Sequence, residues 1–127
     1  MTCSPSLLFG MVVALLAAGV VSVQADTAAG EKVFAKCKVC HTATKGGPNR
    51  VGPNLFGIVG RGVAENATFK YSAAMMALKG TKTWTEAELD AYLSNPKGKV
   101  AGTKMIFVGI PNKADRAHLI EWLKTQK

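Results

Sequence analysis

The chain has 127 residues, which leaves room for one domain, and 16 Lys and Arg against 8 Asp and Glu give it a formal net charge of +8. All of these charged residues lie beyond Ala25. A basic balance of this size is compatible with nucleic acid, an anionic membrane or an acidic protein partner. Three cysteines, one of them at position 3, provide no framework of structural disulfides.

The N-terminal segment is typical of a secretory leader. Residues 7–23 are uncharged and apolar, and Val23-Gln24-Ala25 ends the run with small residues where signal peptidase needs them. We therefore expect a signal peptide over residues 1–25, and a domain over residues 26–127 that is exported to the periplasm. No Lys or Arg precedes the run, and as a helix it would reach ~26 Å at about 1.5 Å per residue, close to a membrane span. A retained membrane anchor is therefore the alternative.

A Cys-Lys-Val-Cys-His stretch stands at residues 37–41. Two thiols three positions apart, followed by an imidazole, are typical of covalent haem attachment, and His is a usual ligand of haem iron. A thioredoxin-like redox pair would need a βαβ context, which no strand-rich stretch supplies. A zinc site would need Cys37, Cys40, His41 and the distant His118, whose spacing is wrong for a finger. A chance match is the remaining alternative, and we expect one covalently bound haem c.

The pattern of apolar residues predicts an all-α fold with three main helices, one short helix and long loops around the haem. The first main helix runs into the haem motif, the second is stopped by Pro96, and the third ends the domain. The short helix spans residues 73–78. Each expected helix begins after a residue that can cap its first turn, namely Asp26 or Thr27, Ser72, Thr85 and Asn112.

Two loops are expected, over residues 45–62 and 97–110. The first holds six glycines and two prolines and should contain no regular element. Its apolar residues are too many for a solvated linker and suggest that it wraps a hydrophobic object; they are Val51, Leu55, Phe56, Ile58 and Val59.

A haem that carries electrons needs a second axial ligand, and four residues could supply it. Met75 and Met76 fall in a helical pattern, where methionine usually fills a core. His118 falls in the last helix, and Met105 in a loop that contains glycine. The residues alone leave this choice open.

The chain resembles the class I cytochromes c, and most of all the mitochondrial-like soluble carriers of bacteria. The resemblance covers residues 27–125 and rests on the haem motif, on Gly-Pro-Asn-Leu at 52–55 with a glycine and Arg61 after it, and on Gly-Thr-Lys-Met at 102–105. It implies that Met105 is the second iron ligand. Gly30, Phe34, Leu119 and Trp122 match the crossing of the family's terminal helices.

The resemblance also implies roles for residues around the iron. Pro53 would accept the other N–H of the His41 ring. Residues expected near the haem propionates are Arg61, Tyr71 and Trp84, and Tyr92 is expected near the methionine sulfur; plain packing is the alternative for each aromatic ring. The chain departs from the family at Met75, where asparagine is frequent, at Lys99 and Ala101, which replace an aromatic residue and a proline, and by two extra residues between Tyr71 and Trp84.

The function that the resemblance implies is one-electron transfer by a monomer, without enzyme activity. A haem enzyme is the competing class, but no distal acid or base is evident near Met105. The expected partners are acidic redox proteins, such as a cytochrome bc-type complex, a terminal oxidase, a reaction centre or a dehydrogenase, with peripheral membrane contact and no nucleic acid. Six lysines flank the ligand segments and should ring the haem edge, unlike Lys70; they are Lys36, Lys38, Lys45, Lys97, Lys99 and Lys104.

Overall fold

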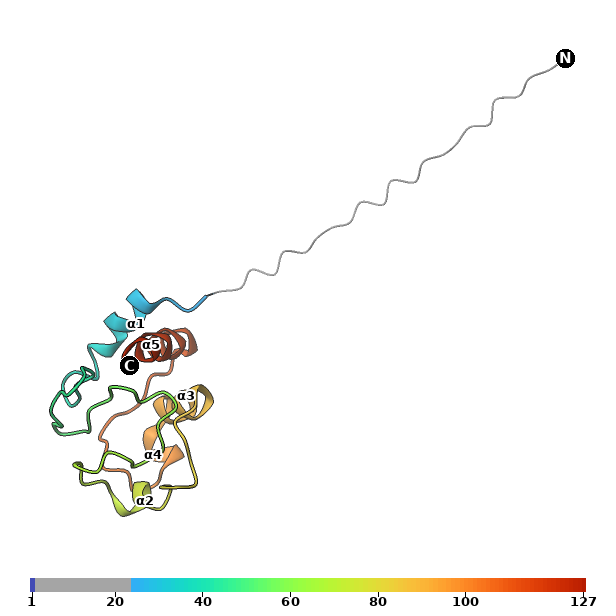
Figure 1. The fold of residues 1–127 in the computed structure, drawn as a ribbon. Helices are drawn as coiled ribbons and strands as arrows, with labels where there is room; N and C mark the ends of the chain where they lie inside the picture. The colour runs from blue at the N-terminus through green and yellow to red at the C-terminus, as the bar shows by residue number, and fades with distance from the viewer. Residues whose placement is uncertain (2–23) are drawn as a thin grey trace.

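The computed structural model describes Met1 and residues 24–127, so almost all of the predicted signal peptide lies outside the described residues. Figure 1 shows residues 24–127 as one rounded body in which the C-terminus lies beside the first helix. Among the described residues, no helix is both long and apolar enough to cross a membrane.

Five helices form the regular structure of residues 24–127, and no strand occurs there apart from one isolated antiparallel bridge between Gly62 and Thr83. The helices are α1 (Thr27–Phe34), α2 (Ala73–Met76), α3 (Glu86–Ser94), α4 (Pro96–Lys99) and α5 (Lys113–Thr125). The predicted all-α class is confirmed, with α1, α3 and α5 as the main helices and α2 as the expected short one.

The second short helix, α4, contradicts the prediction of an extended loop from Lys97 to Ile110. Pro96 occupies its first position, where a missing N–H costs nothing because helix N-termini leave that donor free. The Asn95 side chain accepts a hydrogen bond from Gly98 N–H at 3.0 Å and closes the turn. Pro96 therefore ends α3, as predicted, and also begins the next turn.

The predicted helix caps are present. Asp26, rather than Thr27, caps α1 by accepting the N–H of Ala28 at 2.8 Å. The remaining caps each accept a backbone N–H in the first turn of α2, α3 and α5, and they are Ser72, Thr85 and Asn112.

The first and last helices cross at Gly30. A methyl group there would lie 2.6 Å from the carbonyl carbon of His118 and 2.7 Å from Trp122 Cβ, well inside normal contact distance. Beside the crossing, the rings of Phe34 and Trp122 have centroids 4.4 Å apart. Leu119 is completely buried below them. Glycine thus lets α1 approach α5 closely enough for the aromatic pair to form, as the sequence predicts.

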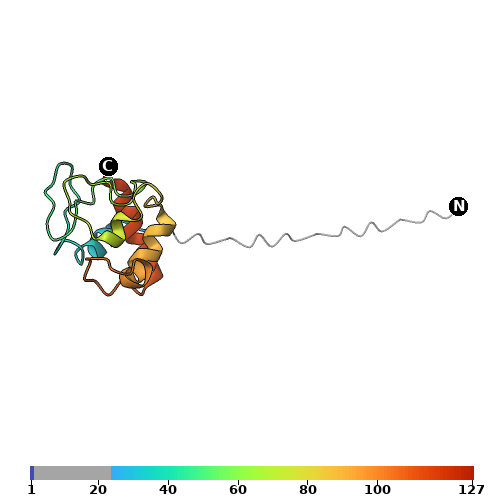
Figure 2. The ribbon, with the colours of Figure 1, turned by 90° about the horizontal axis from the view of Figure 1, so that it is seen from below.

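A buried arginine joins α5 to α3, which lies alongside it (Figure 2). Arg116 Nε donates to Asp90 Oδ1 at 2.7 Å, and its Nη1 donates to the carbonyls of Ile110 and Pro111 at 2.8 and 3.0 Å. A buried guanidinium is tolerated because its donors are satisfied in this way. The contact also fixes the C-terminal end of the loop that carries Met105.

The loop over residues 45–62 contributes to the core, with one exception. Ile58 is buried in the core, Leu55 and Val59 are half-buried against it, and Phe56 is half-buried. Val51 is 79% exposed, so the prediction that it packs inward is wrong. Its neighbours form a tight turn in which Arg50 N–H donates to the Gly52 carbonyl at 2.9 Å, and this turn leaves the valine at its outer corner.

Candidate cofactor-binding site

The haem motif forms a helical turn that follows α1. Cys37 N–H donates to Phe34 O at 2.8 Å, and the N–H groups of Cys40 and His41 donate to Cys37 O at 3.0 and 2.9 Å. Residues three positions apart on such a turn lie on the same side. Both thiols are free and half-buried. The turn therefore presents two thiols and an imidazole from one short segment that Phe34 anchors to α5.

Burial keeps the first thiol protonated. It raises the pKa of Cys37 to about 11, an effect that the nearby Lys36 opposes and Cys40 reinforces. The thiol form of Cys37 therefore predominates near neutral pH.

His41 is held in the tautomer that a metal ligand requires. Its Nδ1 lies 2.7 Å from the carbonyl oxygen of Pro53, which can only accept, so Nδ1 carries the proton and Nε2 keeps a free lone pair. Burial lowers the pKa of His41, while the Pro53 bond acts in the opposite direction. The ring also rests on Gly52, where a methyl group would lie 2.7 Å from both ring nitrogens. The predicted contact between Pro53 and His41 is present.

Asn54 hydrogen-bonds several backbone groups near His41. The sequence analysis named this residue only as part of the Gly-Pro-Asn-Leu motif. Its buried side chain donates to the carbonyls of Thr44 and Gly47 at 2.9 and 2.8 Å and accepts the N–H of Phe56 at 2.8 Å. These bonds fold the glycine-rich loop back against the haem motif. The sequence signal for this role was the position of Asn54, a polar residue between Pro53 and Leu55 in a loop.

A second cluster forms around Arg61. Its backbone carbonyl accepts Trp84 N–H at 2.8 Å, so these two distant residues lie side by side. Its guanidinium donates to Asn54 O and Phe56 O at 3.1 and 3.2 Å. Burial lowers the pKa of Arg61, while the nearby Tyr71 opposes the change. The structure thus brings together the three residues expected near the propionates.

Within residues 24–127, Arg61 Nε is the one buried side-chain nitrogen or oxygen that has no hydrogen-bond partner. An unpaired buried donor of this kind is costly and calls for an acceptor. A carboxylate from a bound cofactor would supply one, so the residues present fit a haem with propionate groups.

Trp84 and Tyr92 pack against each other, with ring centroids 5.0 Å apart. The Tyr92 hydroxyl lies 2.8 Å from Thr103 Oγ1, which also accepts Met105 N–H at 3.3 Å. The Tyr71 hydroxyl accepts Asn66 N–H at 3.3 Å. Thr103 was not predicted to have a role of its own.

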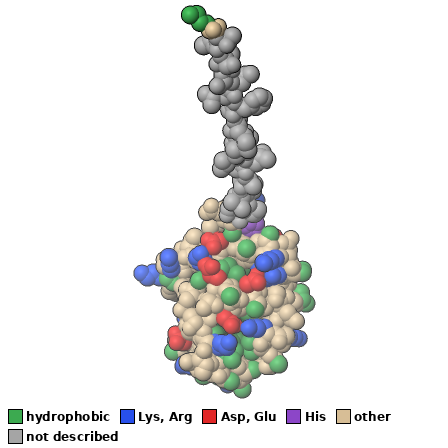
Figure 3. Space-filling model, turned by 90° about the vertical axis from the view of Figure 1, so that its right-hand side faces the viewer, with side chains coloured by type: hydrophobic (Ala, Val, Ile, Leu, Met, Phe, Trp, Pro, Cys, Tyr) green, Lys and Arg blue, Asp and Glu red, His purple; other side chains and the backbone are tan. Residues whose placement is uncertain are grey.

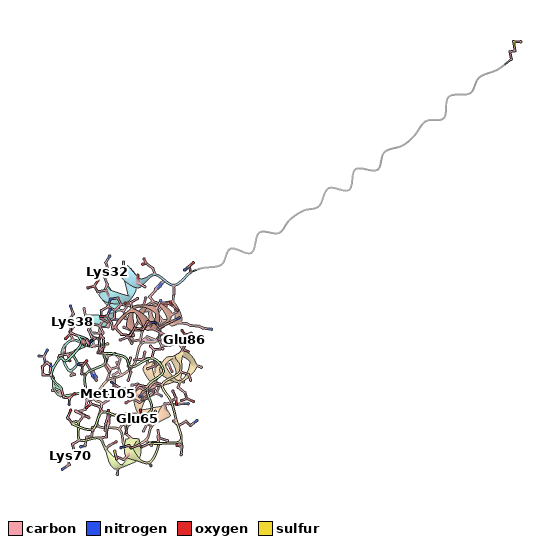
Figure 4. All side chains as sticks on the ribbon, in the orientation of Figure 1. Lys32, Lys38, Glu65, Lys70, Glu86 and Met105 are labelled. Atoms are coloured by element: carbon pink, nitrogen blue, oxygen red, sulfur yellow. The ribbon has the colours of Figure 1, made fainter. Side chains whose placement is uncertain are left out.

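The four candidates for second ligand occupy different surroundings. Met105 is half-buried in a loop and packs against the core, near the middle of the body in Figure 4. Met75 is buried on α2 and Met76 is 45% exposed. His118 Nδ1 accepts Asp26 N–H at 2.7 Å and so belongs to the crossing of α1 and α5. Among the residues that the structure describes, no three His, Cys, Asp or Glu side chains form a group that could hold a metal, so the zinc set is not assembled.

Two of the six lysines that flank the ligand segments, Lys99 and Lys104, bond to other groups of the chain. Lys99 forms an ion pair with Glu88 at 3.1 Å. Lys104 Nζ donates to the carbonyl of Lys70 at 3.1 Å, and Figure 4 places Lys70 on the same side of the molecule as Lys38. The Met105 loop thus contacts the backbone at residue 70, and the position of Lys70 relative to the haem edge stays a prediction.

Residues 27–127 match the family model described as "Cytochrome c". A "Cytochrome c homolog" of Bradyrhizobium diazoefficiens is 50% identical over 79% of this chain and 55% of its own length. "Cytochrome c-type cyt cy" of Rhodobacter capsulatus is 49% identical over 82% of this chain and 51% of its own. The chain thus spans about half the length of these two relatives. The solved structure of cytochrome cH from Methylobacterium extorquens is 44% identical and aligns with a TM-score of 0.71, covering 79% of this chain and 98% of that one.

Proposed function

We propose that this chain, which belongs to the cytochrome c family, is a one-electron carrier and not an enzyme. Family membership implies one covalently attached haem c, which supplies an iron that gains and loses a single electron. The observation that carries the proposal is the helical turn of Cys37, Cys40 and His41, with two free thiols and a proton-free Nε2 on one segment.

Each residue of the site has a part in holding such a group. Cys37 and Cys40 would form the two thioethers, and His41 Nε2 and the Met105 sulfur would be the axial ligands. With protein ligands on both faces, the chain would offer a substrate no open position, which favours a carrier over a haem enzyme. A methionine ligand in an apolar setting would favour the reduced state.

The cluster around Arg61 would hold the charged edge of the group. Arg61 Nε needs an acceptor, and Tyr71 and Trp84 lie beside it. A guanidinium is suited to a carboxylate, since it offers several donors in one plane. We therefore propose that this cluster binds the propionates. We also propose that Tyr92 lies near the Met105 sulfur.

Two variants test the attachment and the ligand. Replacing both Cys37 and Cys40 by serine should abolish haem that resists acid extraction, and abundant acid-stable haem in that variant would overturn the assignment. Met105→Ala should keep the covalent haem but lose the weak red band of iron–thioether bonding. Met76→Ala is the matched control, because its exposed side chain should leave the band unchanged; loss of the band in the control alone would make Met105 the wrong ligand.

The surface around the proposed ligands is suited to an acidic partner. No Asp or Glu occurs between Glu31 and Glu65 or between Asp90 and Asp115. Of the six lysines that flank the ligand segments, five are exposed and make no ion pair within the described residues, and they are Lys36, Lys38, Lys45, Lys97 and Lys104. Five of the eight acidic residues lie instead on α3 and α5, and they are Glu86, Glu88, Asp90, Asp115 and Glu121. Figure 3 shows a face of the molecule on which acidic and basic side chains are interspersed.

Such a charge distribution steers encounter more than it adds affinity. We propose that acidic redox proteins dock on the lysine-rich side, where the exposed Ile106 and Val108 add apolar contact. Electron transfer to such a partner should slow as salt rises, since the Debye length falls from ~10 Å at 0.1 M to ~3 Å at 1 M.

The matched variants are Lys38→Gln on this side and Lys124→Gln, whose ammonium contacts Glu86 and Glu121 on the other. Stopped-flow transfer to an acidic redox protein should slow more in the first variant than in the second, and its salt dependence should weaken. Equal rates for the two variants would mean that net charge alone governs encounter.

The link to the apolar run supports release into the periplasm. Only Gln24 and Ala25 separate the apolar segment over residues 7–23 from Asp26. The backbone N–H of Asp26 donates a hydrogen bond to His118 Nδ1. Two extended residues span only ~7 Å. A retained anchor would therefore hold α1 and α5 against the membrane, whereas a carrier must move between partners. Cleavage after Ala25 predicts a mature chain that begins at Asp26 by mass spectrometry; a membrane-bound chain of full mass would contradict it.

A further inference from the structure

A cavity of about 250 Å³ lies beside Trp84, and neither the motif cysteines nor the proposed iron ligands line it. Its wall is apolar and comes from separate segments of the chain; the residues are Val63, Leu78, Trp84 and Val100. Val63 and Val100 are buried, and Trp84 is 9% exposed. An apolar cavity of about 150 Å³ can hold benzene, so this one has room for an aromatic ring with a short chain.

Three charged side chains complete the lining of the cavity. Glu88 Oε1 lies 3.4 Å from Lys82 Nζ, and Glu88 Oε2 lies 3.1 Å from Lys99 Nζ. The group therefore carries two positive charges and one negative charge. An ammonium has three N–H donors, and within the described residues each of these lysines bonds to a Glu88 oxygen and to no other acceptor. Two donors on each lysine are thus available to a further anion.

Lys99 accounts for the open space. It stands where the resemblance to the class I cytochromes c leads us to expect an aromatic residue. The lysine side chain instead extends to Glu88 and is 36% exposed. A ring at residue 99 would fill the cavity that the lysine leaves open.

We propose that this cavity binds a small aromatic carboxylate, with its ring against Trp84 and its carboxylate between the ammonium groups of Lys82 and Lys99. The apolar wall favours a ring, because burying the ring removes apolar surface from water. The charge of the lining favours an anion, because charge-assisted hydrogen bonds are stronger than neutral ones. The proposed site is separate from the haem-attachment motif and does not depend on the redox role of the chain.

A ligand in this cavity would lie next to the cluster around Arg61. Trp84 N–H donates to Arg61 O at 2.8 Å, and Gly60 N–H donates to Trp84 O at 2.9 Å, so the tryptophan is tied to the segment that carries the arginine. A negative charge near the haem would favour Fe(III) by Coulomb attraction, so binding should lower the midpoint potential. This consequence rests on the proposed function, whereas the binding itself does not.

The test is a titration of the holoprotein with 3-phenylpropionate, measured by calorimetry and by the NMR shift of the Trp84 indole N–H, with Trp122 as the internal reference. We expect an apparent Kd of about 1 mM or lower, which is ordinary for a ligand of this size. The neutral analogue 3-phenylpropanamide should bind about tenfold more weakly, because it lacks the charge that the two ammonium groups would bond.

Four variants locate the site. Lys99→Gln should weaken binding about tenfold, since one ammonium is lost. Lys99→Phe should abolish binding and leave Tm unchanged or higher, because its ring would fill the cavity. Glu88→Gln should tighten binding several-fold, because the native carboxylate competes for the same donors. Lys79→Gln is the control for net charge, because Lys79 is exposed and does not line the cavity.

A Kd above about 10 mM for the parent, or equal affinity for the carboxylate and the amide, would overturn the proposal. Equal weakening in Lys99→Gln and Lys79→Gln would also overturn it, because net charge would then explain the effect. Binding with an unchanged midpoint potential would support the site and overturn its link to the propionates. Absence of covalent haem from the parent protein would overturn the proposed function alone, since the titration can still report the cavity.

Discussion

Gly30→Ala tests how closely the first and last helices must approach. In an isolated helix the change would stabilise by about 1 kcal/mol, because alanine has the higher helix propensity. Here the new methyl group would lie 2.6 Å from the His118 carbonyl carbon and 2.7 Å from Trp122 Cβ. The His118 atoms are backbone, so α1 and α5 must separate.

The expected cost exceeds the gain. Overpacking of a rigid contact typically costs about 1–3 kcal/mol, and loosening the Phe34–Trp122 pair adds about 0.5–1.5 kcal/mol. After the propensity gain is subtracted, we expect a loss of about 2 kcal/mol. For a domain of this size that loss corresponds to a Tm lower by roughly 8–16 °C.

The assay is reversible denaturant unfolding of the holoprotein. Ala28→Gly is the matched control, because Ala28 is exposed on the same helix and should lose only about 1 kcal/mol of propensity. Adding Trp122→Ala to Gly30→Ala should not restore stability, since the nearest atoms belong to the His118 backbone. A rise in stability for Gly30→Ala would refute the close approach.

Two further variants test the site and its surface. Gly52→Ala should reduce the yield of covalent holoprotein several-fold, because a methyl group would lie 2.7 Å from both nitrogens of the His41 ring; the measurement is haem absorbance per protein, and an unchanged yield would contradict the packing. Hydrogen bonding from Lys99 lowers the pKa of Glu88 below 4.5, so the carboxylate favours the fold above that pH and the benefit fades as pH falls through the lowered value. The Tm difference between the parent and Glu88→Gln should therefore shrink from pH 7 to pH 3, whereas a constant offset would argue against the ion pair as its cause.

Local signals in the sequence were sufficient for the helices that begin with a capping residue. Thr85 and Asn112 each bond the N–H groups that their position predicts, because capping depends only on neighbours in the chain. The role of Gly30 was also predictable, because a glycine lowers helix stability and its presence inside a helix suggests that another helix packs closely there. Pro96 was harder, because the same residue can end one helix and begin another.

Contacts between distant segments could not be predicted in the same way. The bond of Lys99 to Glu88 and the bond of Lys104 to the Lys70 carbonyl depend on how loops fold, and composition does not encode their paths. Thr103 is the clearest case in the site. Its position in the motif was evident, but its contact with the Tyr92 hydroxyl arises only because the packing of α3 brings the two oxygens within 2.8 Å.

The crossing of α1 and α5 also sets the order in which this chain can fold during its synthesis. The contact between Asp26 and His118 joins positions 92 residues apart, so the first helix has no partner until nearly the whole domain has been made. Contacts of such long range form slowly, and a helix as short as α1 is marginal on its own. While the chain is being translated, α1 therefore cannot form its crossing with α5. The haem motif follows α1 directly, so its anchoring through the Phe34–Trp122 contact also waits for α5.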